Sequence, residues 1–386
     1  MSNLKKLLYL LLANIFLFLL IEIIFTFFFI FHNSNYYGPL ARLFLSEKKV
    51  TEKTVLYNIK FSKKTGMYVP GEYNLDNIKH SVNKFGFIGE EVSIQNKTGC
   101  RVVALGGSTT AGTETNKPYP KILENLFSQN QFNCDVLNFG FSSKALNFLE
   151  KLLVNEASKF NPSVVSIMSN RNSTMYDSFT TSAVAAEDIV NNKYDLFLYE
   201  FKSFLFLEVM TYRFLNLAYN RAISLFIDDK NKIISPFNPR YFHSIKYFQN
   251  GYKDQILRIN SYCKEKGIKL ILVKQAYFIN LDFQKAINSL SKDELIEKLI
   301  NYNNEKEFTN KTELFWIYTN AILNKNLDEI AVNDENIFIV DPTQDLYSKS
   351  KINYFQKDGL HLNEQGNFII ANKIFESLLS SKLIKN

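Results

Sequence analysis

A serine follows a short apolar run in the segment RVVALGGSTTAG, residues 101–112, where three kinds of chemistry come into question. Two of its glycines have the spacing of a phosphate-binding loop, but Thr113 stands where that loop needs lysine. No GxGxxG pattern of a dinucleotide-binding loop follows the run, so no nucleotide cofactor is expected. The nucleophile turn GxSxG is also incomplete, because Thr110 replaces its second glycine. The remaining interpretation is that Ser108 ends a parallel strand, at the edge where open α/β sheets bind their ligands.

A nucleophilic serine needs a base, and the chain has four histidines. In the segment KDGLHLNEQG, Asp358 stands three residues before His361. A carboxylate at this spacing can hold the imidazole in one tautomer while the other ring nitrogen faces Ser108. The other three histidines have no carboxylate at such local spacing. The same stretch also fits an exposed loop before a helix that Asn363 caps, so both interpretations stay open on these residues alone.

Short apolar runs that are typical of buried parallel strands occur at five places in the chain. These are RVVAL (101–105), DVLNF (135–139), SVVSIM (163–168), KLILVK (269–274) and NIFIVD (336–341). Stretches with helical spacing of apolar residues lie between and after them, at 118–129, 144–159, 246–266 and beyond Asn363. This alternation predicts an α/β fold, with a largely parallel sheet of five strands.

The first residues of the chain, 1–33, differ from the rest. Lys5 and Lys6 precede an apolar run at 7–31 that is long enough to span a bilayer. No small-x-small cleavage site ends the run, so an uncleaved single-pass anchor is expected and a signal peptide is not. The two lysines favour a cytoplasmic N-terminus and an extracytoplasmic body, although basic residues beyond the run weaken this bias. Glu22 would contact an unidentified membrane-protein partner. Alternatively, its side chain would be protonated or would extend toward the membrane surface.

The body is expected to consist of a collar region, 34–99, and a main domain, 100–382. Two inserts interrupt the domain, an aromatic-rich one at 174–245 and a charged, helical one at 280–335. The first insert would supply extra core or a cap over the site. The net charge is +7, but the lysines are scattered, which favours a solvated surface over a nucleic-acid partner.

Three cysteines are too few for a disulfide scaffold, and no CxxC pair is present, so no metal site is expected. Cys100 and Cys134 directly precede two of the expected strands. If those strands are neighbours, the two thiols begin them side by side and could form a disulfide in an oxidising compartment. The alternative is a pair of small buried apolar side chains.

Four blocks in the same order resemble the SGNH, or GDSL-like, hydrolase superfamily. They are GGST after the first strand, NFGFSS after the second, SNRNS after the third and DGLH before the last helix. The resemblance covers residues 100–382 apart from the inserts, and NKFGFIGEE at 83–91 is similar to the lead-in of single-span members. It implies a three-layer, flavodoxin-like sheet with helices on both faces. It also implies a catalytic triad of Ser108, His361 and Asp358 with no cofactor.

The resemblance also implies an oxyanion hole, formed by the backbone N–H groups of Ser108 and Gly140 and by the side-chain amide of Asn172. Such donors stabilise the negative charge that develops on an ester carbonyl oxygen when serine attacks. The first block reads GGST where the family has GDS. The third block has Asn170 and Ser173 where the family has GxND, which makes Asn170 an alternative. The distance from SVVSIM favours Asn172.

Three functions remain open. The first is a membrane-anchored serine esterase that cleaves an acyl ester, with O-acetyl on an extracytoplasmic carbohydrate as the expected substrate. The second is an O-acetyltransferase that passes the acyl group from serine to a sugar hydroxyl. The third is a polysaccharide-binding protein without catalysis. Exclusion of water distinguishes the first two, and the aromatic-rich insert is the candidate cap.

Overall fold

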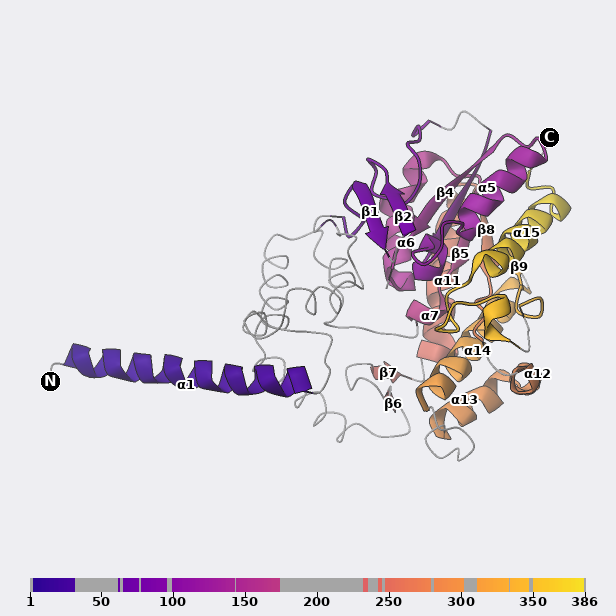
Figure 1. The fold of residues 1–386 in the computed structure, drawn as a ribbon. Coiled ribbons are helices and arrows are strands. Elements are labelled where there is room, and N and C mark those ends of the chain that lie inside the picture. Colours follow the sequence, from indigo (N-terminus) through magenta and orange to yellow (C-terminus); the bar gives the residue numbers. More distant parts are fainter. Residues whose placement is uncertain are drawn as a thin grey trace. The chain divides into compact units, whose positions relative to one another are not determined.

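The computed structural model describes a main body and an N-terminal helix that belong to two different units of the chain (Figure 1). The described residues are 3–31, 62, 65–75, 78–95, 99–142, 144–173, 232–234, 242–244, 247–278, 281–301, 311–332, 334–346 and 350–384. Most of the aromatic-rich insert and much of the collar region therefore lie outside the described residues. The predicted domain boundaries stay predictions.

Five parallel strands form the central sheet in the order β4-β3-β5-β8-β9. Their bounds are β3 (Cys100–Gly106), β4 (Cys134–Gly140), β5 (Val164–Met168), β8 (Lys269–Val273) and β9 (Ile337–Val340). Successive residues of a strand point to opposite faces, so Val102 and Ala104 enter one core while Val103 and Leu105 enter the other. Burial on both faces explains the continuous apolar runs. The predicted α/β fold with five parallel strands is confirmed.

Helices cover both faces of this sheet (Figure 1). One face carries α6 (Leu146–Asn155), α11 (Tyr252–Glu265) and α14 (Lys311–Ala331). The other carries α5 (Tyr119–Gln129) and α15 (Glu364–Ser380), which pack side by side. Two further helices from the charged insert pack on α14, namely α12 (Leu281–Ser289) and α13 (Lys292–Asn301). Short elements include the helical turns η2 (Ala157–Phe160), η4 (Tyr247–Gly251) and η6 (Lys351–Asn353), and the antiparallel pair β6 (Lys232–Ile234) and β7 (Phe242–Ser244).

The described part of the collar region covers the free edge of β4. An antiparallel hairpin, β1 (Gly71–Leu75) and β2 (Ile78–Val82), leads into the segment 83–91. Ile88 in that segment forms a bridge to Asn138 of β4, and the ring of Phe87 lies 4.4 Å from that of Phe139. The collar therefore occupies part of the edge along which another chain could pair with β4.

A disulfide joins the first residues of two neighbouring strands. Cys100 of β3 is in register with Cys134 of β4, and their sulfur atoms are bonded at 2.06 Å. The remaining cysteine, Cys263, is buried on α11, and burial raises the pKa of its thiol to about 12. Cys263 is therefore an unreactive core side chain in the folded protein.

The N-terminal run forms a single helix, α1 (Asn3–Phe31), of 29 residues. Among the residues that the structure describes, no helix has both the length and the apolar character needed to cross a membrane. The anchoring expected of residues 7–31 is not confirmed.

Candidate active site

The strand order brings the expected site residues to one edge of the sheet. β3 lies between β4 and β5, so the carboxyl ends of these three strands meet. Gly106 at the end of β3 is in register with Gly140 of β4 and with Met168 of β5. The serine turn follows β3, and the short helix α7 (Asn170–Ser173) follows β5. This is the edge at which ligands bind in open α/β sheets.

Two glycines shape the turn that presents the serine. After Gly106 the chain enters α4 (Ser108–Ala111) at once, and a Cβ on Gly106 would lie 2.0 Å from Oγ1 of Thr110. A Cβ on Gly107 would lie 2.1 Å from Nδ2 of Asn172. Only glycine at both positions lets the helix and the Asn172 amide approach the strand end so closely. Because Ser108 is the first residue of α4, its N–H has no partner within the helix.

The histidine loop before α15 is held by backbone hydrogen bonds. Asp358 Oδ1 accepts hydrogen bonds from the N–H groups of Leu360 at 2.9 Å and of His361 at 3.0 Å. The carbonyl of His361 accepts from the N–H of Gln356 at 2.7 Å. Asn363 then caps α15, since its side chain accepts from the N–H of Gly366 at 3.0 Å. The predicted cap and the predicted Asp–His pair therefore occur in one loop.

The loop brings His361 to the serine. Its Nε2 lies 2.7 Å from Oγ of Ser108, and its Nδ1 is hydrogen-bonded to Oδ2 of Asp358. The network assigns the tautomer in which Nδ1–H donates to the carboxylate and Nε2 accepts from the serine hydroxyl. Ser108, His361 and Asp358 thus form a continuous hydrogen-bonded chain, although 253 positions separate the serine from the histidine.

Hydrogen bonds and charges around His361 set the protonation states of His361 and Asp358. Burial by itself would lower the pKa of His361, but the Asp358 hydrogen bond and the nearby carboxylates outweigh burial and raise it. Burial likewise opposes ionisation of Asp358, yet hydrogen bonds from His361 and Leu360 lower the pKa of this carboxyl to about 2. Asp358 is therefore ionised at neutral pH, as an orienting carboxylate must be.

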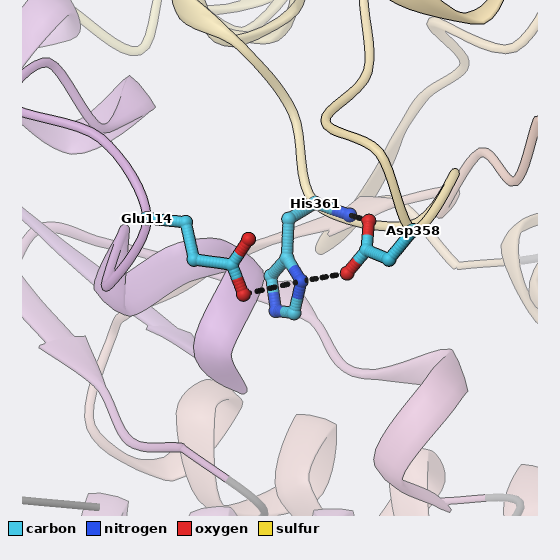
Figure 2. Close-up of side chains that lie close together, drawn as sticks. All are labelled: Glu114, Asp358 and His361. Carbon is cyan, nitrogen blue, oxygen red and sulfur yellow. Dashed lines mark hydrogen bonds and ion pairs between the residues drawn. The ribbon is translucent and has the colours of Figure 1, made fainter. Parts of the chain in front are cut away.

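A second carboxylate, which the sequence reasoning missed, reaches the same ring nitrogen. Oε1 of Glu114 lies 3.0 Å from Nδ1 of His361 (Figure 2). Figure 2 shows the Glu114 and Asp358 side chains approaching the imidazole from different loops. The donor atoms of these three residues lie within 4.8 Å of one another, which would also suit a metal. A metal on Nδ1 would have to displace the proton that Asp358 accepts.

The structure separates the two asparagines between which the third block left a choice. Asn172 places its amide nitrogen against Gly107, beside the serine. Asn170 is completely buried and points to α14, where its Nδ2 donates to Oδ1 of Asn324 at 2.6 Å and to Oδ1 of Asn320 at 3.2 Å. Of the two, Asn172 is the one whose amide lies beside the serine turn.

Gly140 has a different role from the predicted one. Its backbone N–H donates to Oδ1 of Asn138 at 3.0 Å, so this hydrogen is already engaged. A Cβ at this position would lie 2.1 Å from the backbone nitrogen of Ala111. Gly140 therefore permits α4 to pack on the end of β4, and the prediction that its N–H serves the oxyanion is corrected.

Arg171, between the two asparagines, contributes a positive charge that the sequence reasoning also missed. Its guanidinium carbon lies 3.1 Å from the ring centroid of Trp316, and its backbone N–H donates to Oε1 of Gln275 at 2.9 Å. The charge of Arg171 acts on His361 in the direction that lowers its pKa. No sequence spacing relates Arg171 to Trp316 of α14, because only the fold brings them together.

No protein-family model and no curated protein matches the sequence. Solved structures with a similar arrangement include a putative acylhydrolase from Bacteroides fragilis, with 15% identity over 76% of this chain and 92% of that chain and a TM-score of 0.37. A lipase/acylhydrolase from Enterococcus faecalis has 13% identity over 74% and 97%, with a TM-score of 0.38. A family 3 carbohydrate esterase from Clostridium thermocellum has 14% identity over 73% and 96%, with a TM-score of 0.35. At these values the likeness assigns no function.

Proposed function

We propose that the protein is an SGNH-type serine esterase. The observation that carries this proposal is the hydrogen-bonded chain from Ser108 through His361 to Asp358. A serine hydroxyl on the neutral nitrogen of an imidazole, whose other nitrogen is held by an ionised carboxylate, is the arrangement that activates serine for acyl transfer.

The proposed reaction assigns a step to each of these atoms. Oγ of Ser108 attacks the ester carbonyl carbon while Nε2 of His361 takes the hydroxyl proton. The resulting imidazolium gives this proton to the leaving alcohol as the ester C–O bond breaks, which leaves an acyl group on Ser108. Water then attacks the acyl-enzyme, His361 accepts its proton and returns it to Oγ, and the free acid leaves. No cofactor is needed in this sequence of steps.

In this proposal, two groups bind the oxyanion in each tetrahedral intermediate. These are the N–H of Ser108, which begins α4, and the amide of Asn172 beside Gly107. Donors fixed before the reaction stabilise the developing charge without reorganising, and a single such donor is worth about 10²–10³ in kcat. The engaged N–H of Gly140 is not included.

The proposed substrate is an O-acetyl ester on an extracytoplasmic carbohydrate, on the basis of the family resemblance of the four blocks. The apolar run at 7–31 would hold the body at the outer side of a cell membrane, with the N-terminus in the cytoplasm. A disulfide between Cys100 and Cys134 is consistent with such a compartment, because oxidising conditions preserve it.

The test is turnover of p-nitrophenyl acetate by the full chain in detergent. Replacing either Ser108→Ala or His361→Ala is expected to lower kcat by about 10³-fold or more, because the residues act as a unit. Ser128→Ala is the matched control, since this serine is exposed near the end of α5 and lies outside the serine turn. A fluorophosphonate should label Ser108 alone, as read by peptide mass spectrometry.

Adding a deacetylated oligosaccharide to the same reaction separates hydrolysis from transfer. Free acetate that depends on Ser108 supports the esterase, whereas acetyl found on the sugar would replace it with the O-acetyltransferase. Wild-type turnover no faster than that of Ser108→Ala would contradict both and favour a binding protein.

A further inference from the structure

We propose that Glu114 is a second carboxylate partner of His361, and that Glu114 and Asp358 share the Nδ1–H of the imidazole. Glu114 is then a positioning residue, which holds His361 for its reaction with Ser108. This inference rests on the proposed function for its catalytic meaning.

The geometry of the ring nitrogen carries the proposal. Nδ1 has one hydrogen, and it has two carboxylate oxygens in reach, Oδ2 of Asp358 and Oε1 of Glu114 at 3.0 Å (Figure 2). His361 is only 15% exposed, so little water competes for this hydrogen. Either carboxylate can therefore accept it and keep Nε2 directed at the serine.

The loop that carries Glu114 is fixed from two sides. The carbonyl of Glu114 accepts a hydrogen bond from Nε2 of Gln356 at 3.2 Å, which ties it to the histidine loop. The carbonyl of Thr113 lies 3.2 Å from Nε2 of His80 on β2. Because the backbone is held on both sides of the side chain, the fold fixes the position from which Glu114 reaches His361.

Among the described residues, four polar groups surround the imidazole. The carboxylates of Glu114 and Asp358 favour its protonated form, the guanidinium of Arg171 opposes it, and the hydroxyl of Ser108 is neutral. A negative charge removed from this set lowers the pKa of His361. In Glu114→Gln, His361 should therefore stay deprotonated down to a lower pH than in the wild type.

The presence of two carboxylates also changes how much kcat falls when one of them is replaced. In a triad with a single orienting carboxylate, its replacement by the amide lowers kcat by about 10⁴-fold, because the imidazole takes the wrong tautomer. Here Glu114 remains on Nδ1 when Asp358 is neutralised. Asp358→Asn alone should therefore lose far less, and only the double variant should lose the full amount.

The experiment measures kcat/KM for p-nitrophenyl acetate with the full chain, from about pH 5 to pH 9, where a histidine base titrates. The variants are Glu114→Gln, Asp358→Asn, the double variant and Glu114→Asp, which keeps the charge. Glu364→Gln is the control, because Glu364 is an exposed acid at the start of α15 that pairs with Lys117 and not with His361. In parallel, NMR follows the His361 ring through the titration, assigned by comparison with His361→Gln.

Glu114→Gln is expected to retain most of the maximal kcat/KM. The pH below which kcat/KM falls should be lower in Glu114→Gln than in the wild type, and Glu114→Asp should restore the wild-type value. Asp358→Asn should retain at least about tenfold more activity than the double variant, whose loss should approach 10⁴-fold. The proposal is wrong if the double variant is no slower than Asp358→Asn, or if the His361 titration is the same in Glu114→Gln and wild type. Should Ser108→Ala be as active as the wild type, the proposed function fails, and the NMR titration still decides whether Glu114 shares the proton.

Discussion

A single glycine, Gly107, determines how close the amide of Asn172 comes to the serine. The backbone of Gly107 has φ −84° and ψ −154°, which any residue can adopt, so alanine is not excluded by backbone strain. It is excluded by contact, because a Cβ would lie 2.1 Å from Nδ2 of Asn172. The nearest atom is at the end of a side chain, which can move, and so the cost falls on Asn172 and not on the fold.

We predict that Gly107→Ala lowers kcat by about 10²-fold, since it displaces one oxyanion donor. Stability should change little. In Gly106→Ala, by contrast, the new Cβ would lie 2.6 Å from the backbone carbonyl oxygen of Met168, so unfolding should occur at a lower temperature. Thermal melts and p-nitrophenyl acetate turnover, measured on the same samples, separate the two effects.

The double variant Gly107→Ala with Asn172→Ala gives the control. Removal of the amide relieves the contact, so stability should equal that of the wild type while activity stays low. Recovered activity in this double variant would show that Asn172 is no oxyanion donor.

Some of these residues could be found from the sequence and others could not. Asp358 and His361 are three positions apart, and one loop imposes their hydrogen bonds, so a local pattern indicates them. Glu114 approaches the same histidine from a loop 247 positions away, and no local spacing records this. Gly140 was misjudged for a related reason, because the bond that engages its N–H comes from the side chain of Asn138, which a glycine motif does not reveal.

At the scale of elements, a network of amides fixes α7 relative to the serine turn. Asn170 on α7 donates to Asn320 and Asn324 of α14, and both of these donate to the carbonyl of Gln275, at 2.7 Å and 3.1 Å. Nε2 of Gln275 then donates to Oγ1 of Thr109 on α4 at 3.2 Å. The elements that carry Asn172 and Ser108 are thus connected through one partly buried chain of hydrogen bonds.

We predict that Asn170→Ala destabilises the protein by about 1–3 kcal/mol, because the hydroxyl of Tyr252 and the amides on α14 lose a buried partner. Activity should fall as well, since α7 carries Asn172. Urea unfolding measures the first effect and kcat the second. Asn125→Ala on the exposed side of α5 should stay within about 0.5 kcal/mol of the wild type, and an equal loss in both variants would argue against the network.

Strands were easier to predict than the ends of helices. All five apolar runs became strands of the sheet, within one or two residues, because burial on both faces leaves an unbroken apolar signal. The stretch 144–159 was expected as one helix, but α6 ends at Asn155 and η2 follows it. The turn ends at Asn161 with φ 49°, a left-handed conformation that asparagine tolerates and that hydrophobic spacing does not report.

At the scale of the whole molecule, the cysteines offer a test of the proposed compartment. Cys100 and Cys134 are bonded, whereas Cys263 is buried with a thiol pKa raised to about 12. A thiol reagent should therefore find no reactive cysteine in the native protein, because the thiolate is the nucleophile. The same chain kept in the cytoplasm would have all three cysteines reduced, since that compartment does not preserve disulfides.

This difference tests the proposed topology without reference to activity. We predict that the full chain, expressed in a bacterial host, stays with the membrane after alkaline carbonate extraction and that its body is digested by protease added outside the inner membrane.

The full chain, unfolded in denaturant without reductant, should bind one maleimide, and with reductant it should bind three, as counted by mass spectrometry. A variant without the apolar run at 7–31 should remain in the cytoplasm and bind three maleimides in denaturant alone. Release by carbonate would show that the run at 7–31 does not anchor the protein. Three maleimides bound by the full chain in denaturant alone would show that the body does not face an oxidising compartment, and a cytoplasmic ester would then replace the proposed carbohydrate substrate.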